Sequence, residues 1–545
     1  MKKLSIWLFP FFIIIVSSLY LLPIMQPGLY TSHDGIPQIA RIAASIKAVS
    51  DGQFPARWAG GLNYGYGNPG LIFFYSLSNY ITGIIHFFGF NLQDSYKILM
   101  GATFILAPLS FYLWAKQIFK EWAALVSSLF YGLAPYSFLD VFVRGHLAES
   151  LAFIFPPLIL YAIEKNGHKI SVGNILIGGL SYAFLILSHN ILSFSFSIII
   201  FGYIVVKSLR DKKLILANTS ILLIGLIITV YFWLPALIEA KYINSKLLIG
   251  EWYKEHFLKF EGLIYSSWGF GSNINTQGGL SAQIGPLHMI FSVLVFLLFL
   301  RKKIKDKLHV GYWFVILSLA IFLSTPLSEF LWKNIHTLQQ FQFPWRFTAI
   351  SSFATAVLTG YFFTKVKNKI LILTVLLFLF ILSIPMAKVA AYQDRLDSYY
   401  FNYPGTAAYH SEATTIWVAG DASSYPKAPI TIVSGKGRVY NVFRKSNFHS
   451  FEVQAEKNLE ILDSTVYFPG WRVFVDNKKV PIEFQDINYR GLITFNVPRG
   501  HHFVKVEFGE SPIRLFADYV SLIGIVIVGL IFIFRERINT YIQKI

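Results

Sequence analysis

Cysteine is absent from this sequence, so neither a disulfide framework, a thiolate metal site nor a thiol nucleophile is available. The sequence also lacks the glycine-rich phosphate loops typical of ATP- and nicotinamide-binding proteins, the HExxH zinc motif, and an Asp-x-Asp pair in its first polar loop. Thiol chemistry is therefore excluded, and nothing indicates ATP- or nicotinamide-dependent catalysis. The redox compartment stays open.

Charged residues are scarce as well. They make up 14% of the 545 residues, against 54% hydrophobic residues, and the mean hydropathy is +0.53. This composition predicts an integral membrane protein whose main partner is the lipid bilayer. The net charge of +18 (47 minus 29) is explained by basic cytoplasmic loops that fix orientation, so we expect no nucleic-acid partner.

Thirteen apolar runs approach the roughly 20 residues that cross a bilayer. They are 4–24, 70–90, 94–115, 121–139, 147–163, 171–188, 190–207, 214–236, 284–300, 310–328, 347–364, 370–388 and 515–534. The first run follows Lys2 and Lys3 like a signal peptide, but no small-x-small cleavage site precedes Tyr30. We therefore expect an uncleaved first span.

The distribution of basic residues decides which runs cross. All strongly basic connections fall on the cytoplasmic side only if 70–90 does not cross. We therefore predict twelve crossings with both termini cytoplasmic, and a surface or re-entrant helix at 70–90. Nearly all unusual polar residues then lie in the extracytoplasmic loops, which indicates that the working face is outside.

The segment 389–514 differs from the rest. It is polar, and runs such as 450–455 and 502–508 alternate apolar and polar residues between turns. This period of two predicts an antiparallel, sandwich-like β-domain outside the membrane. The expected organisation is a mainly α transmembrane module at 1–388 with a large first outer loop at 25–93, the β-domain at 389–514, and a final helix with a basic cytoplasmic tail at 515–545.

The first outer loop holds the strongest candidate for chemistry, His33-Asp34. Asp34 precedes an amphipathic helical pattern, so one interpretation is a helix N-cap. The other is a carboxylate placed at the membrane exit as a general base or metal ligand. The adjacent histidine and the many aromatic residues favour the second interpretation.

The same loop continues with Arg57-Trp58 and the aromatic, glycine-rich run that contains Tyr64 and Asn68. Flat rings stack on sugars and amides bond hydroxyls, but tyrosines also anchor proteins at the membrane interface. Arg57 suits a substrate phosphate or a lipid headgroup equally.

Ionisable residues also lie at the ends of later spans, where they are costly unless paired or functional. Asp140 and Arg144 are spaced to pair with each other, yet Arg144 and Glu149 also suit an anionic ligand in a cavity. His189 is either a simple turn residue or a second polar group on the outer face.

Three further candidates lie where spans meet the outer face. Glu239 is placed where a helix emerges, and Trp345 and Arg346 are placed where one re-enters. An arginine at this depth is suited to bidentate capture of a lipid phosphate.

Several motifs together resemble a known family. HDGIPQIARI, GQFPARW, LNYGYGNPG, VRGHLAE, LSHN, WLPALIE and FPWRF resemble the bacterial membrane proteins labelled "6-pyruvoyl-tetrahydropterin synthase-related", and the pattern at 467–508 resembles YfhO-like membrane proteins. The resemblance implies membership of the GT-C superfamily of polytopic glycosyltransferases in a bacterial-type cytoplasmic (cell) membrane. These enzymes carry an acidic residue in the first outer loop, which Asp34 matches. Many also have an Asp-x-Asp or Glu-x-Asp pair and a divalent metal; here Ser32 stands two residues before Asp34, which leaves a metal cofactor open.

The expected function is thus transfer of a sugar from a polyprenyl-phosphate-linked donor to an extracytoplasmic acceptor glycan, lipid or protein. Asp34 would be the base and His33 would orient the acceptor hydroxyl. Arg57, Arg144 and Arg346 would hold the lipid phosphate, and Trp58, Tyr64 and Asn68 would line the sugar site. The alternatives are a transporter or flippase of lipid-linked saccharides, which the lack of inverted repeats disfavours, and a non-enzymatic envelope-assembly protein.

Overall fold

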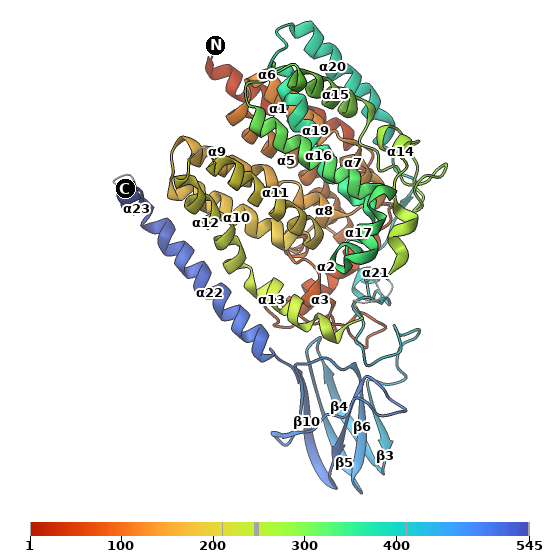
Figure 1. Ribbon diagram of the computed structural model, residues 1–545. Coiled ribbons are helices and arrows are strands. Elements are labelled where there is room, and N and C mark those ends of the chain that lie inside the picture. Colours follow the sequence, from red (N-terminus) through yellow and green to blue (C-terminus); the bar gives the residue numbers. More distant parts are fainter. Residues whose placement is uncertain (1, 210, 245–249, 410, 543–545) are drawn as a thin grey trace.

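The computed structural model describes residues 2–209, 211–244, 250–409 and 411–542. The predicted loop 237–283 and the predicted tail after 534 each include a few residues outside these ranges. A helical bundle forms one end of the molecule and a pair of β-sheets forms the other (Figure 1).

Helices coincide with all twelve predicted crossings. They are α1 (Lys2–Tyr20), α5 (Leu92–Ile118), α6 (Glu121–Gly132) with α7 (Pro135–Phe138) and the π-helix η1 (Leu139–Arg144), α8 (Leu147–Ala152) with α9 (Phe155–His168), α10 (Val172–Ser188), α11 (Asn190–Ser208), α12 (Lys213–Ile228) with α13 (Val230–Glu239), α15 (Pro286–Leu300), α16 (Lys307–Ser324), α19 (Thr348–Phe363), α20 (Lys369–Ser383) and α22 (Pro512–Ile533).

Within the described residues, six helices are long and apolar enough to cross a membrane, or eight if each of two bent pairs is one span. The bent pairs are Glu121–Gly132 with Pro135–Arg144, at 42°, and Lys213–Ile228 with Val230–Tyr242, at 67°. Apolar helices at Trp7–Tyr20, Val172–Ser188 and Pro286–Leu300 are shorter. Twelve crossings therefore stay a prediction.

The run 70–90 is broken into α3 (Gly70–Phe73) and α4 (Leu77–Phe87). With 11 residues, α4 is about 17 Å long at about 1.5 Å per residue, and the hydrocarbon core is about 30 Å thick. This run is therefore too short to cross as a helix. Its break, Phe74–Ser76, contributes to the site described below.

A β-rich region late in the chain is confirmed. Its eight strands are β3 (Ile430–Ser434), β4 (Gly437–Arg444), β5 (Phe448–Ala455), β6 (Leu459–Val466), β7 (Trp471–Val475), β8 (Lys478–Val480), β9 (Leu492–Val497) and β10 (Gly500–Phe508). They form two antiparallel sheets in the orders β4-β5-β10-β7-β8 and β3-β6-β9.

The two sheets share one apolar core, because alternate residues of each strand point inward. Phe451 and Val453 of β5 and Val504 of β10 meet Ile461 of β6 and Phe495 of β9 there. The predicted sandwich-like arrangement is thus present. Its placement outside the membrane stays a prediction.

The bundle and the sheets are joined by the first loop, by α22 and by short elements. Strand β1 (Leu29–Tyr30) pairs with β2 (Tyr392–Gln393). The remaining helices of the described residues are the longer α2 (Gly35–Ser50) and the short η2 (Ala240–Tyr242), η4 (Glu251–His256), α14 (Phe260–Ile264), η5 (Pro326–Ser328), α17 (Glu329–Asn334), α18 (His336–Gln339), η6 (Pro344–Phe347), η7 (Ile384–Met386), α21 (Asp397–Phe401) and α23 (Arg535–Ile542).

Helix α22 leaves the sheets and runs along the outside of the bundle beside α13 and α12 (Figure 1). The start of α1 and the end of α22 lie toward the end of the bundle that is remote from the strands. The side of the membrane on which the two termini lie stays a prediction.

Candidate active site

A sharp turn after η1 forms the centre of the candidate site. The π-helix η1 ends at Gly145, which has a left-handed φ of 62°. A Cβ atom at Gly145 would lie 2.2 Å from the Ser32 Oγ, so only glycine allows the first loop to approach this closely. Short π-helices recur at functional sites, and this one carries Asp140 and Arg144.

Two backbone hydrogen bonds hold the first loop against this turn. The His33 N–H donates to the Val143 carbonyl at 3.1 Å, and the Asp34 N–H donates to the Arg144 carbonyl at 2.8 Å. Residues more than a hundred positions apart in sequence are thereby fixed side by side. Asp34 and Arg144, which were both predicted to lie on the outer face, are neighbours in the structure.

Asp34 occupies the N-cap position of α2 but does not act as a cap. Its φ and ψ are −111° and −7°, and its carboxylate accepts no hydrogen bond from the N–H groups of α2. The side chain is half-buried. The neighbouring His33 is exposed, and its Nε2 atom donates to the Phe270 carbonyl at 2.8 Å. The capping interpretation therefore does not account for the Asp34 carboxylate.

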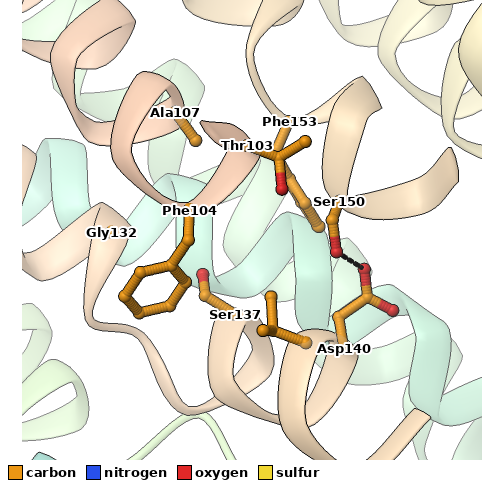
Figure 2. A pocket seen from close by; sticks show the side chains of 9 residues that line it. Thr103, Phe104, Ala107, Gly132, Ser137, Asp140, Ser150 and Phe153 are labelled. Carbon is orange, nitrogen blue, oxygen red and sulfur yellow. Dashed lines mark hydrogen bonds between the residues drawn. The ribbon is translucent and has the colours of Figure 1, made fainter. Parts of the chain in front are cut away.

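Arg144 is buried between two carboxylates. Its Nη1 atom lies 2.7 Å from an Asp140 oxygen and 2.6 Å from a Glu149 oxygen. The hydroxyl of Tyr136 donates to Glu149 at 2.5 Å, and the hydroxyl of Ser150 donates to Asp140 at 2.8 Å (Figure 2). Of the two interpretations of this turn, the structure has the internal ion pair. Arg144 is already neutralised, which argues against a free phosphate-binding guanidinium.

Figure 2 shows a cavity that Asp140 lines from one side, together with Thr103, Phe104 and Phe153. Its volume of about 20 Å³ has room for about one water molecule. A sugar does not fit there. The space is part of the packing behind the turn and not a substrate pocket.

His146 and His189 face each other beside Glu149. Each histidine caps a helix: His146 Nδ1 accepts the Glu149 N–H, and His189 Nδ1 accepts the Leu192 N–H, both at 3.2 Å. The His146 Nε2 lies 3.1 Å from the Tyr75 hydroxyl, and the Tyr75 ring stacks on His189 at 5.3 Å. The break in the 70–90 run thus supplies an aromatic residue to the site.

His146, Glu149 and His189 offer ligand atoms that lie within 4.8 Å of one another. Their hydrogen bonds, however, do not suit a metal ion. An Nδ1 atom that accepts an N–H group carries no proton, so each neutral ring keeps its proton on Nε2, the atom that would have to bind the metal. Glu149 is in addition paired with Arg144. The group is arranged to donate hydrogen bonds, and the metal dependence left open above gains no support from it.

Two other arginines border the same group. Arg41 of α2 is only 8% exposed, and its guanidinium lies 4.5 Å from the Phe74 ring and 5.5 Å from the Tyr75 ring. Arg346 of η6 donates to the Phe341 carbonyl at 2.9 Å and to Gln342 at 3.2 Å. Its buried Nε atom has no hydrogen-bond partner among the described residues.

Arg41 and Arg346 differ from Arg144 in their charge partners. The salt bridges found in the described part of the chain include neither of them. The charges of both reach His189 and Glu412. Trp345, next to Arg346, is buried and lies 5.1 Å from the Arg144 guanidinium.

Glu412 lies in the segment that joins α21 to β3, and it is half-buried. Burial raises the pKa of its carboxyl group above the ordinary value, and Arg41, Arg346 and Asp34 all act on it electrostatically. This segment is held to the bundle side by the Asn244 N–H, which donates to the Thr414 carbonyl at 2.9 Å. The charges of both arginines thus act on a carboxyl group of the segment that leads to β3.

The loop residues predicted to line a sugar site have other contacts. Trp58 is fully buried and packs against Trp471 and Phe508 of the β-sheets at 5.4 and 5.2 Å. Asn68 is buried and bonds Thr406 and Gly70, and Tyr64 lies against the Tyr425 ring at 5.2 Å. Trp58 has no free face for a sugar, because it belongs to the core that attaches the first loop to the sheets.

Arg57 and Glu239 are likewise held in ion pairs elsewhere. Arg57 Nη2 lies 2.6 Å from Asp518 of α22, and Nη1 donates to the Tyr231 carbonyl at 2.8 Å. Glu239 lies 3.1 Å from the Nε atom of the fully buried Arg514. Neither side chain is free for a phosphate or a sugar in this structure.

Of the residues predicted from sequence, the structure therefore brings together Asp34, Arg144, Glu149, His189, Trp345 and Arg346. Sequence reasoning did not assign a role to Arg41, Tyr75, His146 or Glu412. Arg41 carried a usable signal, since it is a basic residue next to the apolar positions Ile39 and Ala40 of an amphipathic helix. Glu412 carried no such sequence signal, because the segment around it shows no helical or strand periodicity.

A sequence model of the 6-pyruvoyl-tetrahydropterin synthase related domain, described as a membrane protein, matches residues 71–392. The chain belongs to this family. The match covers more than half of the chain and includes Arg144, Glu149, His189 and Arg346, and it begins after Asp34 and Arg41. The family resemblance noted from the motifs is thereby confirmed, and the protein is a membrane protein.

Crystal structures of the oligosaccharyltransferase from Archaeoglobus fulgidus are similar to the chain at low identity. The apo form has 12% identity and a TM-score of 0.42, covering 71% of this chain and 57% of that one. AglB with an inhibitory peptide and a dolichol-phosphate has 12% identity and a TM-score of 0.39 (73% and 56%). The complex with Zn and sulfate has 16% identity and a TM-score of 0.41 (70% and 54%). The chain spans little more than half the length of these proteins. No curated protein matches it.

Proposed function

We propose that this protein is a membrane glycosyltransferase of the GT-C type, which moves a sugar from a polyprenyl-phosphate-linked donor to an acceptor hydroxyl on the outer side of the cell membrane. The acceptor is a glycan, a lipid or a protein. The β-rich region, joined to the site through the segment that carries Glu412, recognises that acceptor.

The observation that carries this proposal is the state of Asp34. Its carboxylate is half-buried, does not cap α2, and is held beside the Arg144 turn by a backbone hydrogen bond of 2.8 Å. A carboxylate that is fixed in position but free of a structural hydrogen bond within α2 is suited to accept a proton. The Arg144–Asp140–Glu149 cluster supplies the rigid support for its backbone.

In the reaction, Asp34 accepts the proton of the acceptor hydroxyl. The hydroxyl oxygen forms a bond to the anomeric carbon of the sugar, and the bond from that carbon to the phosphate oxygen breaks. The lipid phosphate leaves with the electron pair. Arg346, which lacks a carboxylate partner among the described residues, stabilises the negative charge that develops on this oxygen.

The remaining predicted residues keep smaller roles in this proposal. His189, with its proton on Nε2, and Trp345 are candidate contacts for the sugar. His33 lies at the outer edge of the site, where it orients the acceptor. Arg57, Trp58, Tyr64, Asn68 and Glu239 have no part in the reaction, because each is held in the structural contacts described above.

The test is to incubate the purified protein with a panel of radiolabelled polyprenyl-phosphate sugars and to measure released lipid phosphate and labelled product. The expected result is release that requires both an acceptor and intact Asp34. If the intact sugar-lipid instead moves across the membrane of proteoliposomes and its sugar–phosphate bond is not cleaved, the protein is a flippase and the proposed transferase activity is wrong.

A further inference from the structure

The outer face of the five-stranded sheet β4-β5-β10-β7-β8 carries aromatic rings that point away from the core. Tyr440, Phe443 and Phe503 are 37%, 50% and 41% exposed. Strand residues point alternately to the two faces of a sheet, and the shared core takes the other set, such as Val453 and Val504. Clustered exposed aromatic residues are typical of a binding surface.

The strand register arranges these rings and several polar side chains in two rows across the sheet. The first row is Tyr440, Glu452 and Phe503, and the second is Phe443, Ser450, Lys505, Phe474 and Lys479. Residues directly opposite each other on paired strands share a face. Neighbouring strands are about 4.8 Å apart, so the two rings of the first row are about 10 Å apart, with a carboxylate between them. Rings and hydrogen-bonding groups therefore alternate across the sheet.

Two carboxylates on this face are engaged within the sheet. Glu452 accepts a hydrogen bond from the Asn441 amide at 2.8 Å and lies 3.0 Å from the His501 Nε2. Glu507 lies 2.9 Å from the Arg472 guanidinium. Neither carboxylate is therefore left to neutralise the other cations of the face.

Three cations of the same face lack a carboxylate partner. Arg438, Lys479 and Lys505 take part in none of the salt bridges found among the described residues of the β-sheets. The Lys505 Nζ lies 5.6 Å from the Phe503 ring and donates to the Asn477 amide oxygen at 3.1 Å. The face thus has unbalanced positive charge beside its aromatic rings, which is complementary to an anionic partner.

The combination of spaced rings, hydrogen-bonding groups and free cations fits one class of polymer. The apolar C–H face of a sugar packs on a flat aromatic ring, and its hydroxyls bond to amide and carboxylate oxygens. Acid groups on the sugars would meet the cations. An acidic peptide would be held by the same cations, but it would not need rings at this spacing.

We propose that the outer face of β4-β5-β10-β7-β8 binds an acidic glycan. Tyr440 and Phe503 stack on its sugar rings, and Lys505 contacts an acid group between them. The inference rests on the proposed function in one respect, since the glycan is then the acceptor of the transferred sugar. Binding itself requires no transfer step.

The experiment measures equilibrium binding of an oligogalacturonate, a chain of acidic sugars, to the purified full-length protein in detergent. Its methyl ester has the same sugar chain without the charge, and polyglutamate has the charge without sugar rings. The oligogalacturonate is expected to bind tightest, and its binding should weaken as salt screens the cations. Absence of oligogalacturonate binding would overturn the proposal. Equal binding of polyglutamate would also overturn it, because the face would then recognise charge alone.

Substitutions on the face separate stacking from charge. Phe503→Leu keeps an apolar side chain but removes the flat ring, and is expected to weaken oligogalacturonate binding roughly three- to ten-fold. Phe503→Trp keeps a flat ring and should retain most of the affinity. Lys505→Gln should weaken binding several-fold and reduce its salt dependence. Lys457→Gln changes an exposed lysine in the loop between β5 and β6, and this matched control should bind like the native protein.

The variants also decide what a negative result means. Unchanged oligogalacturonate binding in Phe503→Leu and Lys505→Gln would overturn the proposal, because the polymer would then bind elsewhere. Binding that follows the expected pattern in a protein that transfers no sugar would contradict the proposed function and leave this glycan-binding face intact.

Discussion

The protein holds two groups of buried or half-buried arginines that differ in their partners. In the first, here called the paired group, Arg57 and Arg514 contact Asp518, Glu510 and Glu239 where the first loop, α13 and α22 meet. In the second, here called the open group, Arg41 and Arg346 lie beside Tyr75 and the Arg144 turn, and no salt bridge with a described residue neutralises them.

The difference separates arginines that hold the fold together from arginines that are available for binding. In the paired group each guanidinium has a carboxylate within salt-bridge distance, so the group attaches α22 and the β-sheets to the bundle. In the open group the described residues supply aromatic rings and helix-capping histidines but no carboxylate within salt-bridge distance. Mutations in the paired group should therefore change stability, and mutations in the open group should change binding.

The largest stability effect is expected for Glu239→Gln. This substitution removes the buried carboxylate nearest to the fully buried Arg514 and leaves it only the more distant, partly exposed Glu510 at 3.7 Å. Breaking a buried ion pair costs about 3–5 kcal/mol, so thermal unfolding in detergent should occur at a clearly lower temperature. The matched control is Glu412→Gln, which should unfold close to the native temperature. Equal losses for the two variants would remove the distinction between the groups.

Trp58→Ala is expected to have the next largest effect. The indole is fully buried between Trp471 and Phe508, and truncating such a side chain costs about 3–5 kcal/mol at well-packed sites, less where neighbours collapse. The fraction that stays folded should bind farnesyl phosphate normally. Loss of binding without loss of stability would return Trp58 to the substrate site.

Arg144→Lys should have a moderate effect on stability and little effect on the donor. Arg144 bridges Asp140 and Glu149, and an ammonium group keeps the charge while changing the geometry. We expect a loss of about 1–3 kcal/mol and an unchanged KM for the donor. A raised donor KM in a variant of native stability would mean that Arg144 also binds phosphate.

The smallest effect is a pH dependence in the β-rich region. Burial acts to raise the pKa of Asp463, but His449, Arg444 and Thr465 together hold it below its ordinary value. A carboxyl group with a lowered pKa in the folded state stabilises the fold above its unfolded value near 4, and this contribution is lost as the pH falls through the folded-state pKa. Asp463→Asn should flatten that acid-side loss of stability. An unchanged pH profile would contradict the assignment.

The sequence predicted the helices and strands well, because their signals are local. The apolar runs placed a helix at every expected span, and the period of two predicted the strands between 430 and 508. Within the site, Asp34, Arg144 and Arg346 were found from charges at span ends. The partners that decide their roles were not predictable, since Glu239 with Arg514 and Arg57 with Asp518 are joined across more than 270 positions by the packing of α22.

The first loop shows the same limit. Trp58 and Asn68 have the residue types of a sugar site, but the contact of Trp58 with Trp471 and Phe508 depends on a β-sheet encoded some 400 residues later. Residue types therefore predicted that this loop is functionally important. Burial and contacts in the structure show that Trp58 and Asn68 have structural contacts, whereas the Asp34–Arg41 part of the loop borders the candidate site.

The central claim is that Asp34 is the general base, and Asp34→Asn tests it most directly. Asparagine keeps the size and the backbone hydrogen bond to Arg144 but does not accept the proton, so sugar transfer should fall by about 10²–10⁴-fold. Thermal unfolding and farnesyl phosphate binding should stay close to native values. Full turnover in Asp34→Asn, measured as released lipid phosphate, would contradict the account.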